Sequence, residues 1–413
     1  MARKLAGVGA VLVEGPKWCG KTTTCEQVAE SILYMADPET HEQNLRAAQI
    51  NIKDLLEGGR PRLIDEWQEV PKFWDAVRYA VDHSDADGQF ILTGSAVPPD
   101  SNEIVHTGTG RIAKLRMRPM TLWESGESSG GVSFASLFAG ESLTTAPAKP
   151  WRLKDIAHLT CRGGWPRAVL QRPEISLDRA FEYYEAVVGS DISRVDKVPR
   201  DPERVKRLMR SYARLQGTQS NLSAIRKDMK EHDDRTLDED TVGSYLKALR
   251  KIFVVEDVPA WSPCLRSKAV VRTSDTRYFS DPSIATAAME LGPGDLMNDL
   301  RSFGYFFETM AVRDIRCYAE AIGGSVSHFL DRNGLECDAV VHLRNGTSGL
   351  IEVKLGGESL IEEGVVALND LTGLIDTKRM KDVAFRMVLT ATGDAAYRRS
   401  DGVVICPIGC LKP

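Results

Sequence analysis

The sequence lacks several features that would define common classes of protein. No apolar run approaches the ~18 residues that a membrane-spanning helix needs, so no membrane association is expected. The eight cysteines include no C-x-x-C pair, which argues against a zinc ribbon and against a disulfide framework. The seven histidines include no H-E-x-x-H pattern, which argues against zinc catalysis. Reduced thiols of this kind favour a cytoplasmic location.

The sequence also has no large excess of charge of one sign. The net charge of −5 argues against a wholly basic nucleic-acid-binding protein. The charges are nevertheless uneven, because residues 194–235 carry 12 Lys/Arg against 7 Asp/Glu, a local excess of +5. This segment is either a nucleic-acid-binding face or a solvated helical surface, and on charge alone the second interpretation is favoured.

The length predicts more than one domain. At roughly 150 residues per domain, 413 residues correspond to two or three. We predict three, with boundaries after residues 145 and 295: an N-terminal domain (1–145), a helical middle domain (146–295) and a C-terminal domain (296–413). The small, proline-bearing segment 142–150 is the best candidate for a linker.

A phosphate-binding loop lies near the N-terminus. Residues 15–22 fit G-x-x-x-x-G-K-[ST], between an apolar strand at 10–13 and a helix expected from Thr22 to Ser31. This order directs backbone N–H groups at a phosphate, while Lys21 reaches the β- and γ-phosphates and Thr22 holds magnesium. The predicted ATP-binding residues are Gly15, Pro16, Lys17, Trp18, Cys19, Gly20, Lys21, Thr22 and Thr23.

Acidic and hydroxyl residues follow the next apolar strands. Residues 63–66, Leu-Ile-Asp-Glu, have the Walker B pattern: Asp65 binds Mg²⁺ and Glu66 polarises the attacking water. The strand at 90–95 carries Thr93, our candidate sensor of the γ-phosphate. Arg111 is either an arginine finger for a neighbouring subunit or a surface arginine. Alternation of strands and helices predicts an α/β fold, with a parallel sheet and the nucleotide at the carboxyl ends of its strands.

These motifs together resemble a family of bacterial and archaeal AAA-type ATPases. The resemblance rests on residues 15–22, 63–66, 93–95 and 110–111, and extends over nearly the whole chain. It implies ATP and Mg²⁺ as cofactors and a C-terminal domain with a nuclease-like end. Analogy with AAA proteins further implies a homo-oligomer, such as a hexameric ring. One departure is that the first strand begins almost at once, whereas a longer segment precedes it in that family.

The middle segment is expected to be helical. Apolar residues at helical spacing (Leu177, Ala180, Phe181, Tyr184 and Val188, then Val205, Leu208, Met209 and Tyr212) predict core-facing helices. Two short helices at 222–229 and 241–253, followed by apolar strands near 254–255 and 278–279, form a winged-helix pattern. Ser244, Lys247 and Arg250 would lie on the exposed side of the second helix. Winged helices either bind DNA or serve only as packing modules.

The C-terminal segment resembles the PD-(D/E)xK nuclease core. A helix holding Glu308 precedes strands at 325–330, 335–343 and 350–355, which are joined by Asn-Gly turns. Period-two alternation places Asp338 and Glu336 on one face of their strand, and Glu352 and Lys354 on one face of theirs. The resemblance implies that Asp338 and Glu352 bind Mg²⁺, that Glu308 completes the acidic site and that Lys354 activates water.

The sequence as a whole predicts an Mg²⁺-dependent ATPase that acts on nucleic acid, DNA rather than RNA. One alternative is an ATP-dependent regulator or remodeller of a protein partner, with a catalytically silent nuclease-like domain. Another is a structural oligomer that uses nucleotide only for assembly.

Overall fold

The computed structural model describes residues 1–96, 107–233, 237–262, 274–375, 381 and 383–413, and it divides into two compact units. Unit 1 comprises Met1–Pro119, Val187–Asp201 and Tyr245–Val254, and unit 2 comprises the rest of the chain. The units do not follow the predicted boundaries at 145 and 295. Two later segments group with the N-terminal sheet, where Arg116, for example, lies over the ring of Phe253 at 4.2 Å. The three-domain division stays a prediction.

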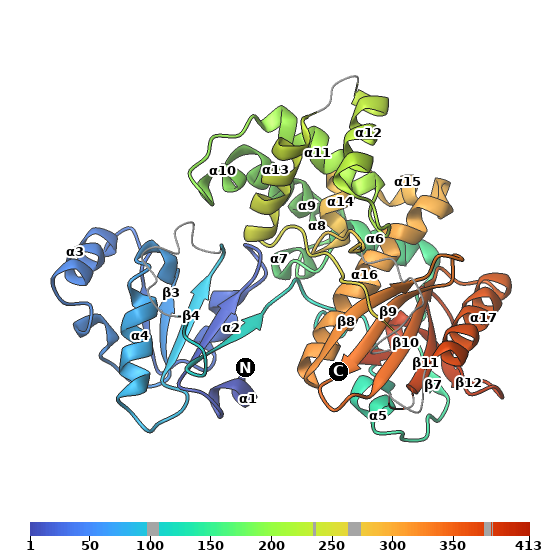
Figure 1. The fold of residues 1–413 in the computed structure, drawn as a ribbon, viewed down its shortest axis with the longest axis horizontal. Helices are drawn as coiled ribbons and strands as arrows, with labels where there is room; N and C mark the ends of the chain where they lie inside the picture. The colour runs from blue at the N-terminus through green and yellow to red at the C-terminus, as the bar shows by residue number, and fades with distance from the viewer. Residues whose placement is uncertain (97–106, 234–236, 263–273, 376–380, 382) are drawn as a thin grey trace. The chain divides into compact units, whose positions relative to one another are not determined.

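Unit 1 is built on a five-stranded sheet in the order β2-β3-β4-β1-β5, with all strands parallel (Figure 1). The strands are β1 (Ala10–Glu14), β2 (Ser31–Tyr34), β3 (Arg62–Asp65), β4 (Phe90–Gly94) and β5 (Ile112–Arg116). The helices are α1 (Ala2–Leu5), α2 (Lys21–Glu26), α3 (His41–Asn51), α4 (Phe73–Asp82) and α10 (Ile192–Arg194), with short helical turns η1 (Asp54–Leu56), η2 (Trp67–Glu69) and η4 (Val187–Asp191). The predicted parallel α/β sheet is confirmed.

Helices cover both faces of this sheet, which explains why its central strands read as continuous apolar runs. On one face Leu12, Ile64 and Leu92 pack with α4. On the other face Val11, Val13 and Ile91 pack with α1 and α2 through Leu5 and Cys25. Alternate residues of β1 therefore enter two different cores, and the loop that follows β1 starts from a rigid strand.

The helix after the glycine loop is shorter than expected. It ends at Glu26, and Ser31–Tyr34 is a strand that pairs with β3, with Ile32 beside Leu63. The prediction of a helix to Ser31 was wrong because Ile32 packs in the core through the sheet, whereas Val28 is 37% exposed. Tertiary pairing with β3 outweighs the local helical pattern.

Unit 2 contains a seven-stranded mixed sheet in the order β7-β12-β13-β11-β10-β9-β8 and a small parallel pair, β14-β6. The strands are β6 (Val132–Ser133), β7 (Ala146–Pro147), β8 (Gly324–Leu330), β9 (Glu336–Leu343), β10 (Ser348–Lys354), β11 (Val383–Thr390), β12 (Ala395–Arg398), β13 (Val404–Pro407) and β14 (Leu411–Lys412), and η5 (Ile408–Cys410) is a short turn. Both predicted Asn-Gly turns are confirmed: Gly334 and Gly346 have φ of 90° and 88°, and they join antiparallel strands.

The predicted linker is part of this sheet. Within 142–150, Ala146–Pro147 forms β7 and pairs antiparallel with β12. Pro147 lies on an edge strand, where a residue without an N–H is tolerated in a sheet. Ser129 also donates to the Pro147 carbonyl at 2.9 Å. The segment is therefore anchored, and the linker interpretation was wrong.

The helices of unit 2 precede and flank the sheet. They are α5 (Phe134–Phe138), α6 (Leu153–Arg162), α7 (Pro166–Val169), α8 (Pro173–Ser176), α9 (Asp178–Ala186), α11 (Pro202–Arg214), α12 (Leu222–Asp233), α14 (Pro282–Ala288), α15 (Pro293–Asn298), α16 (Leu300–Ala321) and α17 (Glu358–Leu374). Helix α13 (Glu239–Lys251) begins in unit 2, and its residues from Tyr245 onward belong to unit 1. The apolar stripe of α11 is buried as predicted. In α9, Phe181 is 38% exposed and lies outside the core. After α12 and α13, Val255 and Phe279 form an antiparallel bridge, where the sequence predicted paired strands.

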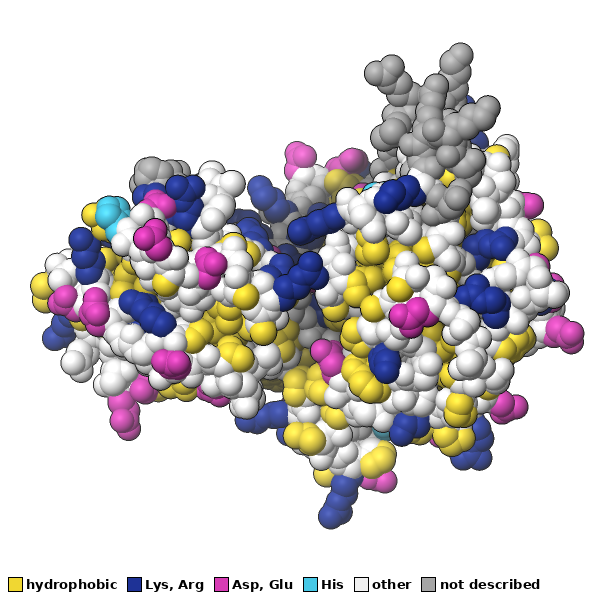
Figure 2. All heavy atoms as spheres, turned by 90° about the horizontal axis from the view of Figure 1, so that it is seen from below, with side chains coloured by type: hydrophobic (Ala, Val, Ile, Leu, Met, Phe, Trp, Pro, Cys, Tyr) yellow, Lys and Arg dark blue, Asp and Glu magenta, His cyan; other side chains and the backbone are white. Residues whose placement is uncertain are grey.

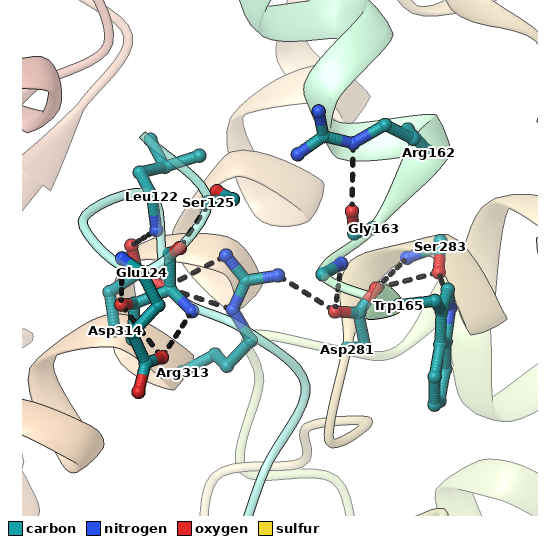
Figure 3. A network of polar contacts seen from close by, with 12 residues as sticks. Leu122, Glu124, Ser125, Arg162, Gly163, Trp165, Asp281, Ser283, Arg313 and Asp314 are labelled. Atoms are coloured by element: carbon teal, nitrogen blue, oxygen red, sulfur yellow. Dashed lines mark hydrogen bonds and ion pairs between the residues drawn. The ribbon is translucent and has the colours of Figure 1, made fainter. Parts of the chain in front are cut away.

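A buried ionic network joins four segments of unit 2 (Figure 3). Arg313 of α16 donates to Asp281 at 2.7 Å and to Asp314 at 2.8 Å. Asp281 accepts the N–H of Gly164 at 3.0 Å, and Asp314 accepts that of Leu122 at 2.9 Å. The three charged side chains are at most 2% exposed, so the segments carrying them are held together without solvent.

On the face drawn in Figure 2, Lys/Arg and Asp/Glu side chains both occur among hydrophobic and uncharged ones. Within the described residues, no helix is both long enough and apolar enough to span a bilayer.

Candidate functional site

The glycine loop connects β1 to α2, and the backbone at Met117 packs directly against it. A Cβ on Gly15 would lie 2.0 Å from the carbonyl oxygen of Met117, so only glycine fits there. Gly20 has φ of 93°, a left-handed conformation that glycine adopts without strain. The ammonium of Lys21 is buried and donates to the carbonyls of Gly15 and Pro16 at 3.0 and 2.8 Å. The lysine thus folds back over its own loop.

Three predicted residues meet at the carboxyl ends of the strands. The Thr22 hydroxyl donates to Oδ1 of Asp65 at 2.8 Å, and the Thr93 hydroxyl donates to the same oxygen at 2.5 Å. The strand order explains this, because β4 lies between β1 and β3 and brings Thr93 beside Asp65. Thr93 therefore orients the Asp65 carboxylate, and its role as a γ-phosphate sensor stays a prediction.

Glu66 follows β3 in an unusual backbone conformation with φ of 54°. Its Oε2 accepts from the Ser95 hydroxyl at 3.2 Å and from the Gln68 side-chain amide. Burial raises the pKa of Glu66, and Lys21 opposes this shift. A carboxylate fixed by two donors next to Asp65 suits the orientation of a water molecule. Neither Ser95 nor Gln68 was predicted, although Ser95 ends the strand that carries Thr93.

Arg111 lies at the opposite end of the sheet from the glycine loop of its own chain. The residue after it, Ile112, pairs with Ala10 at the start of β1, whereas the loop follows Glu14 at the end of that strand. Its guanidinium forms an ion pair with Asp82 at 2.6 Å. Arg111 therefore cannot serve its own nucleotide site, and action on a neighbouring subunit stays a prediction.

The remaining loop residues differ in exposure. Lys17 donates to Asp191 of unit 1 at 2.7 Å. Trp18 is 49% exposed, and Thr23 is exposed as well. Cys19 is fully buried, and burial raises the pKa of its thiol, so a structural role fits it better than a reactive one.

The donor set suits a small hard cation. Thr22 and Asp65 supply a hydroxyl and a carboxylate oxygen, which are ligands that Mg²⁺ prefers. Neighbouring ligands of an octahedral Mg²⁺ at ~2.1 Å stand about 3 Å apart, close to the 2.8 Å between these two oxygens. The residues present therefore fit the magnesium ion that the sequence predicts.

Comparison with protein families agrees with this geometry. Residues 8–125 match the family model described as an AAA domain. These residues form an AAA-type P-loop domain. The match covers the sheet of unit 1 from before β1 to beyond β5, and so includes the glycine loop, Asp65 and Glu66.

A second family model matches the middle of the chain, and solved structures show weaker similarity. Residues 153–295 match a domain of unknown function, DUF8612, with bounds close to the predicted middle segment 146–295. No curated protein matches the chain. Among solved structures, the chain is similar to the Walker-type ATPase paby2304 of Pyrococcus abyssi, at 15% identity and a TM-score of 0.43, covering 70% of this chain and 93% of that one. It is also similar to the Aeropyrum pernix ORC2 protein, at 14% identity and a TM-score of 0.26, covering 63% and 84%.

Outside the AAA domain, a second group of predicted residues comes together in unit 2. Ala339 lies opposite Ile351, and the same antiparallel register carried one residue further places Asp338 opposite Glu352. Asp338 accepts the N–H of Val353 at 2.7 Å, and Lys354 pairs with Glu352 at 2.7 Å. The predicted neighbourhood of Asp338, Glu352 and Lys354 is thus present.

The ionisation of this cluster is strongly shifted. Burial, reinforced by Asp338, raises the pKa of Glu352 well above its ordinary value. Burial opposes the charged form of Lys354, but Asp338 and Glu352 together raise its pKa. The second oxygen of Glu352, Oε1, is buried and has no hydrogen-bond partner. An unpartnered carboxylate oxygen beside another carboxylate is suited to receive a cation.

Glu308 has a different environment from the one predicted. It is partly buried and accepts a hydrogen bond from the hydroxyl of Tyr278. Burial and the charge of Asp338 raise the pKa of Glu308. Within the described residues, no group of three or more His, Cys, Asp or Glu is placed to hold one metal ion. The arrangement therefore fits a site of two carboxylates, with Tyr278 as a contact that sequence patterns did not indicate.

Helix α13 presents the polar residues that the winged-helix pattern singled out. Ser244, Lys247 and Arg250 are all exposed, whereas Leu246 and Leu249 between them are buried. This confirms the orientation expected from the helical period, and a role in binding DNA stays a prediction.

Proposed function

We propose that the AAA domain binds ATP with Mg²⁺ and hydrolyses the terminal phosphoanhydride. The observation that carries the proposal is the contact of Thr22 with Asp65, which joins the two motifs at one point. Lys21 would move its ammonium from the loop carbonyls to the β- and γ-phosphates. Glu66 would orient the attacking water, and Asp65 and Thr22 would hold the ion. Bound Mg²⁺ would neutralise charge on the phosphates.

Lys21→Ala should lower ATP turnover by about 10²–10³-fold, because the transition state loses its nearest fixed cation. The measurement is steady-state phosphate release by the full chain in Mg²⁺. The matched control is Lys72→Ala, which removes an exposed lysine at the start of α4 and should leave turnover unchanged. Turnover that survives in Lys21→Ala would contradict the assignment of the loop.

The energy of hydrolysis would drive an action on nucleic acid, DNA in the first instance. Support comes from the exposed Ser244, Lys247 and Arg250 of α13 and from the carboxylate cluster of unit 2. The subunits would assemble into a homo-oligomer, such as the hexameric ring expected by analogy with AAA proteins. In that assembly Arg111 would act on the nucleotide site of the neighbouring subunit. The rival proposal is an ATP-dependent regulator of a protein partner, in which the carboxylate cluster is silent.

As a second activity we propose a PD-(D/E)xK-type nuclease site in unit 2. Asp338 and the unpartnered oxygen of Glu352 would hold Mg²⁺, and Lys354 would position water. Two carboxylates suffice for this ion, which retains several of its own waters. Glu308 would complete the site only after releasing the hydrogen bond from Tyr278.

Linear, single-stranded and branched DNA should be cut by the wild-type chain with Mg²⁺ and ATP, and not by Lys354→Ala or Glu352→Gln. Glu363→Gln, which changes an exposed glutamate on α17, is the matched control and should still cut. Gel analysis of the products, with a melting curve for each variant, measures the effect. No cutting by the wild type, with ATP turnover indifferent to DNA, would favour the regulator.

A further inference from the structure

A segment distant in sequence contacts the phosphate-binding loop within unit 1. Asp191 ends the π-helical turn η4, and its Oδ1 accepts from the ammonium of Lys17 at 2.7 Å. The two residues are 174 positions apart, and both belong to unit 1. The Ser190 hydroxyl approaches the same oxygen at 3.4 Å. Single π-turns inside α-helical stretches are uncommon and frequently occur at functional sites.

The two ammonium groups of the loop have different partners. Lys21 is buried and bonded to backbone carbonyls, whereas Lys17 has a side chain 43% exposed and is paired with a carboxylate that is 9% exposed. Lys17 occupies a variable position of the G-x-x-x-x-G-K-T motif, so the motif itself does not require a lysine there. A half-exposed side chain keeps the rotamer freedom needed to change partners.

Bound polyphosphate would bring a second anion to the same loop. ATP carries several negative charges that the loop residues face, and a phosphate oxygen would compete with the Asp191 carboxylate for the ammonium of Lys17. We propose that Asp191 is an internal competitor of the nucleotide phosphates for Lys17, so that ATP binding releases residues 187–201 from the loop. This inference rests on the proposed ATP site and names its regulation.

Thermodynamic reciprocity fixes the sign of the effect. If ATP binding breaks the Lys17–Asp191 pair, then removing the pair must favour ATP binding by the same free energy. An ion pair with one half-exposed partner corresponds to a two- to fivefold change, since such pairs contribute up to about 1 kcal/mol. A carboxylate that merely braced the loop would have the opposite effect, because its loss would weaken nucleotide binding.

The test is calorimetric titration of the full chain with Mg²⁺–ATP. Asp191→Asn should lower the Kd about two- to fivefold, and this gain should vanish in the Lys17→Ala background. Asp196→Asn is the matched control: Asp196 lies in the same segment but pairs with Arg200 and not with the loop. Unchanged or weaker ATP binding by Asp191→Asn would overturn the proposal.

A second measurement does not depend on affinity. Hydrogen exchange of residues 187–201 should become faster when ATP binds the wild type, and ATP should have no such effect in Lys17→Ala. Equal or slower exchange in the wild type would overturn the proposal. Failure of the ATP site itself is recognised separately, because the wild type would then bind no ATP and Lys21→Ala would change nothing.

Discussion

Glu66→Gln should bind ATP as tightly as the wild type and hydrolyse it about 10²–10⁴-fold more slowly, the contribution typical of a positioned acid–base group. Glutamine has the same length, so the contacts with Ser95 and Gln68 can persist while the carboxylate that polarises water is lost. Phosphate release measures turnover, and titration measures binding. Glu69→Gln, an exposed change three residues away, is the control. Loss of ATP binding in Glu66→Gln would show that the role of Glu66 has been misplaced.

The dependence of ATP turnover on pH provides a second test of the role of Glu66. Burial raises the pKa of Glu66 above its ordinary value, and only the ionised form can accept a proton from water. Wild-type turnover should therefore fall as the pH drops through this raised pKa, at a higher pH than an exposed glutamate would give. The residual turnover of Glu66→Gln should lack this acidic limb. An identical limb in both proteins would assign it to another group.

Local sequence patterns were sufficient for the parts of the site that lie at strand ends. Continuous apolar runs identified β1, β3 and β4, and parallel pairing then required Thr22, Asp65 and Thr93 to meet at one edge. The same reasoning brought Asp338 and Glu352 together, because Asn-Gly turns fix the register of the hairpins. In both cases a short pattern, repeated on neighbouring strands, determines the contact.

Contacts between distant segments were not predictable in this way. Nothing near Asp191 indicates that it pairs with Lys17, and the small residues around Ala146 have no pattern that distinguishes an edge strand from a linker. Ile32 could not be placed from local sequence either, because its spacing from Val28 is typical of a helix, whereas in the structure it lies on a strand that pairs with β3. The free energy of these contacts comes from packing that only the folded chain defines.

Two charged residues within a buried run of α16 indicate internal ion pairs from the sequence alone. Arg313 and Asp314 interrupt the run from Met310 to Ile315, which is otherwise apolar and buried. Charges are buried only when they are paired, because desolvation of an isolated ion is too costly. Their presence in such a run therefore indicates internal partners, although the sequence does not indicate that one of them is Asp281.

Arg313→Met should lower the free energy of unfolding of unit 2 by about 3–5 kcal/mol, the usual effect of removing one partner from a buried ion pair. The substitution keeps most of the volume but leaves Asp281 and Asp314 buried without their cation. Chemical denaturation of the full chain, followed by a probe in unit 2, measures the loss. Arg152→Met is the control, since that guanidinium is 73% exposed and its pair with Asp155 contributes at most about 1 kcal/mol.

The stability that Arg313→Met loses should also depend on pH, and the direction of this dependence shows whether an unpaired carboxylate is the cause. Burial raises the pKa of Asp314 to about 6, and Arg313 holds it down. Because the folded-state pKa lies above the unfolded value, ionisation of Asp314 costs stability as the pH rises from about 4 through 6. Without Arg313 that pKa rises further, so the gap between variant and wild type should widen above pH 6 and narrow below it. A gap independent of pH would mean that lost packing, and not an unpaired carboxylate, destabilises the variant.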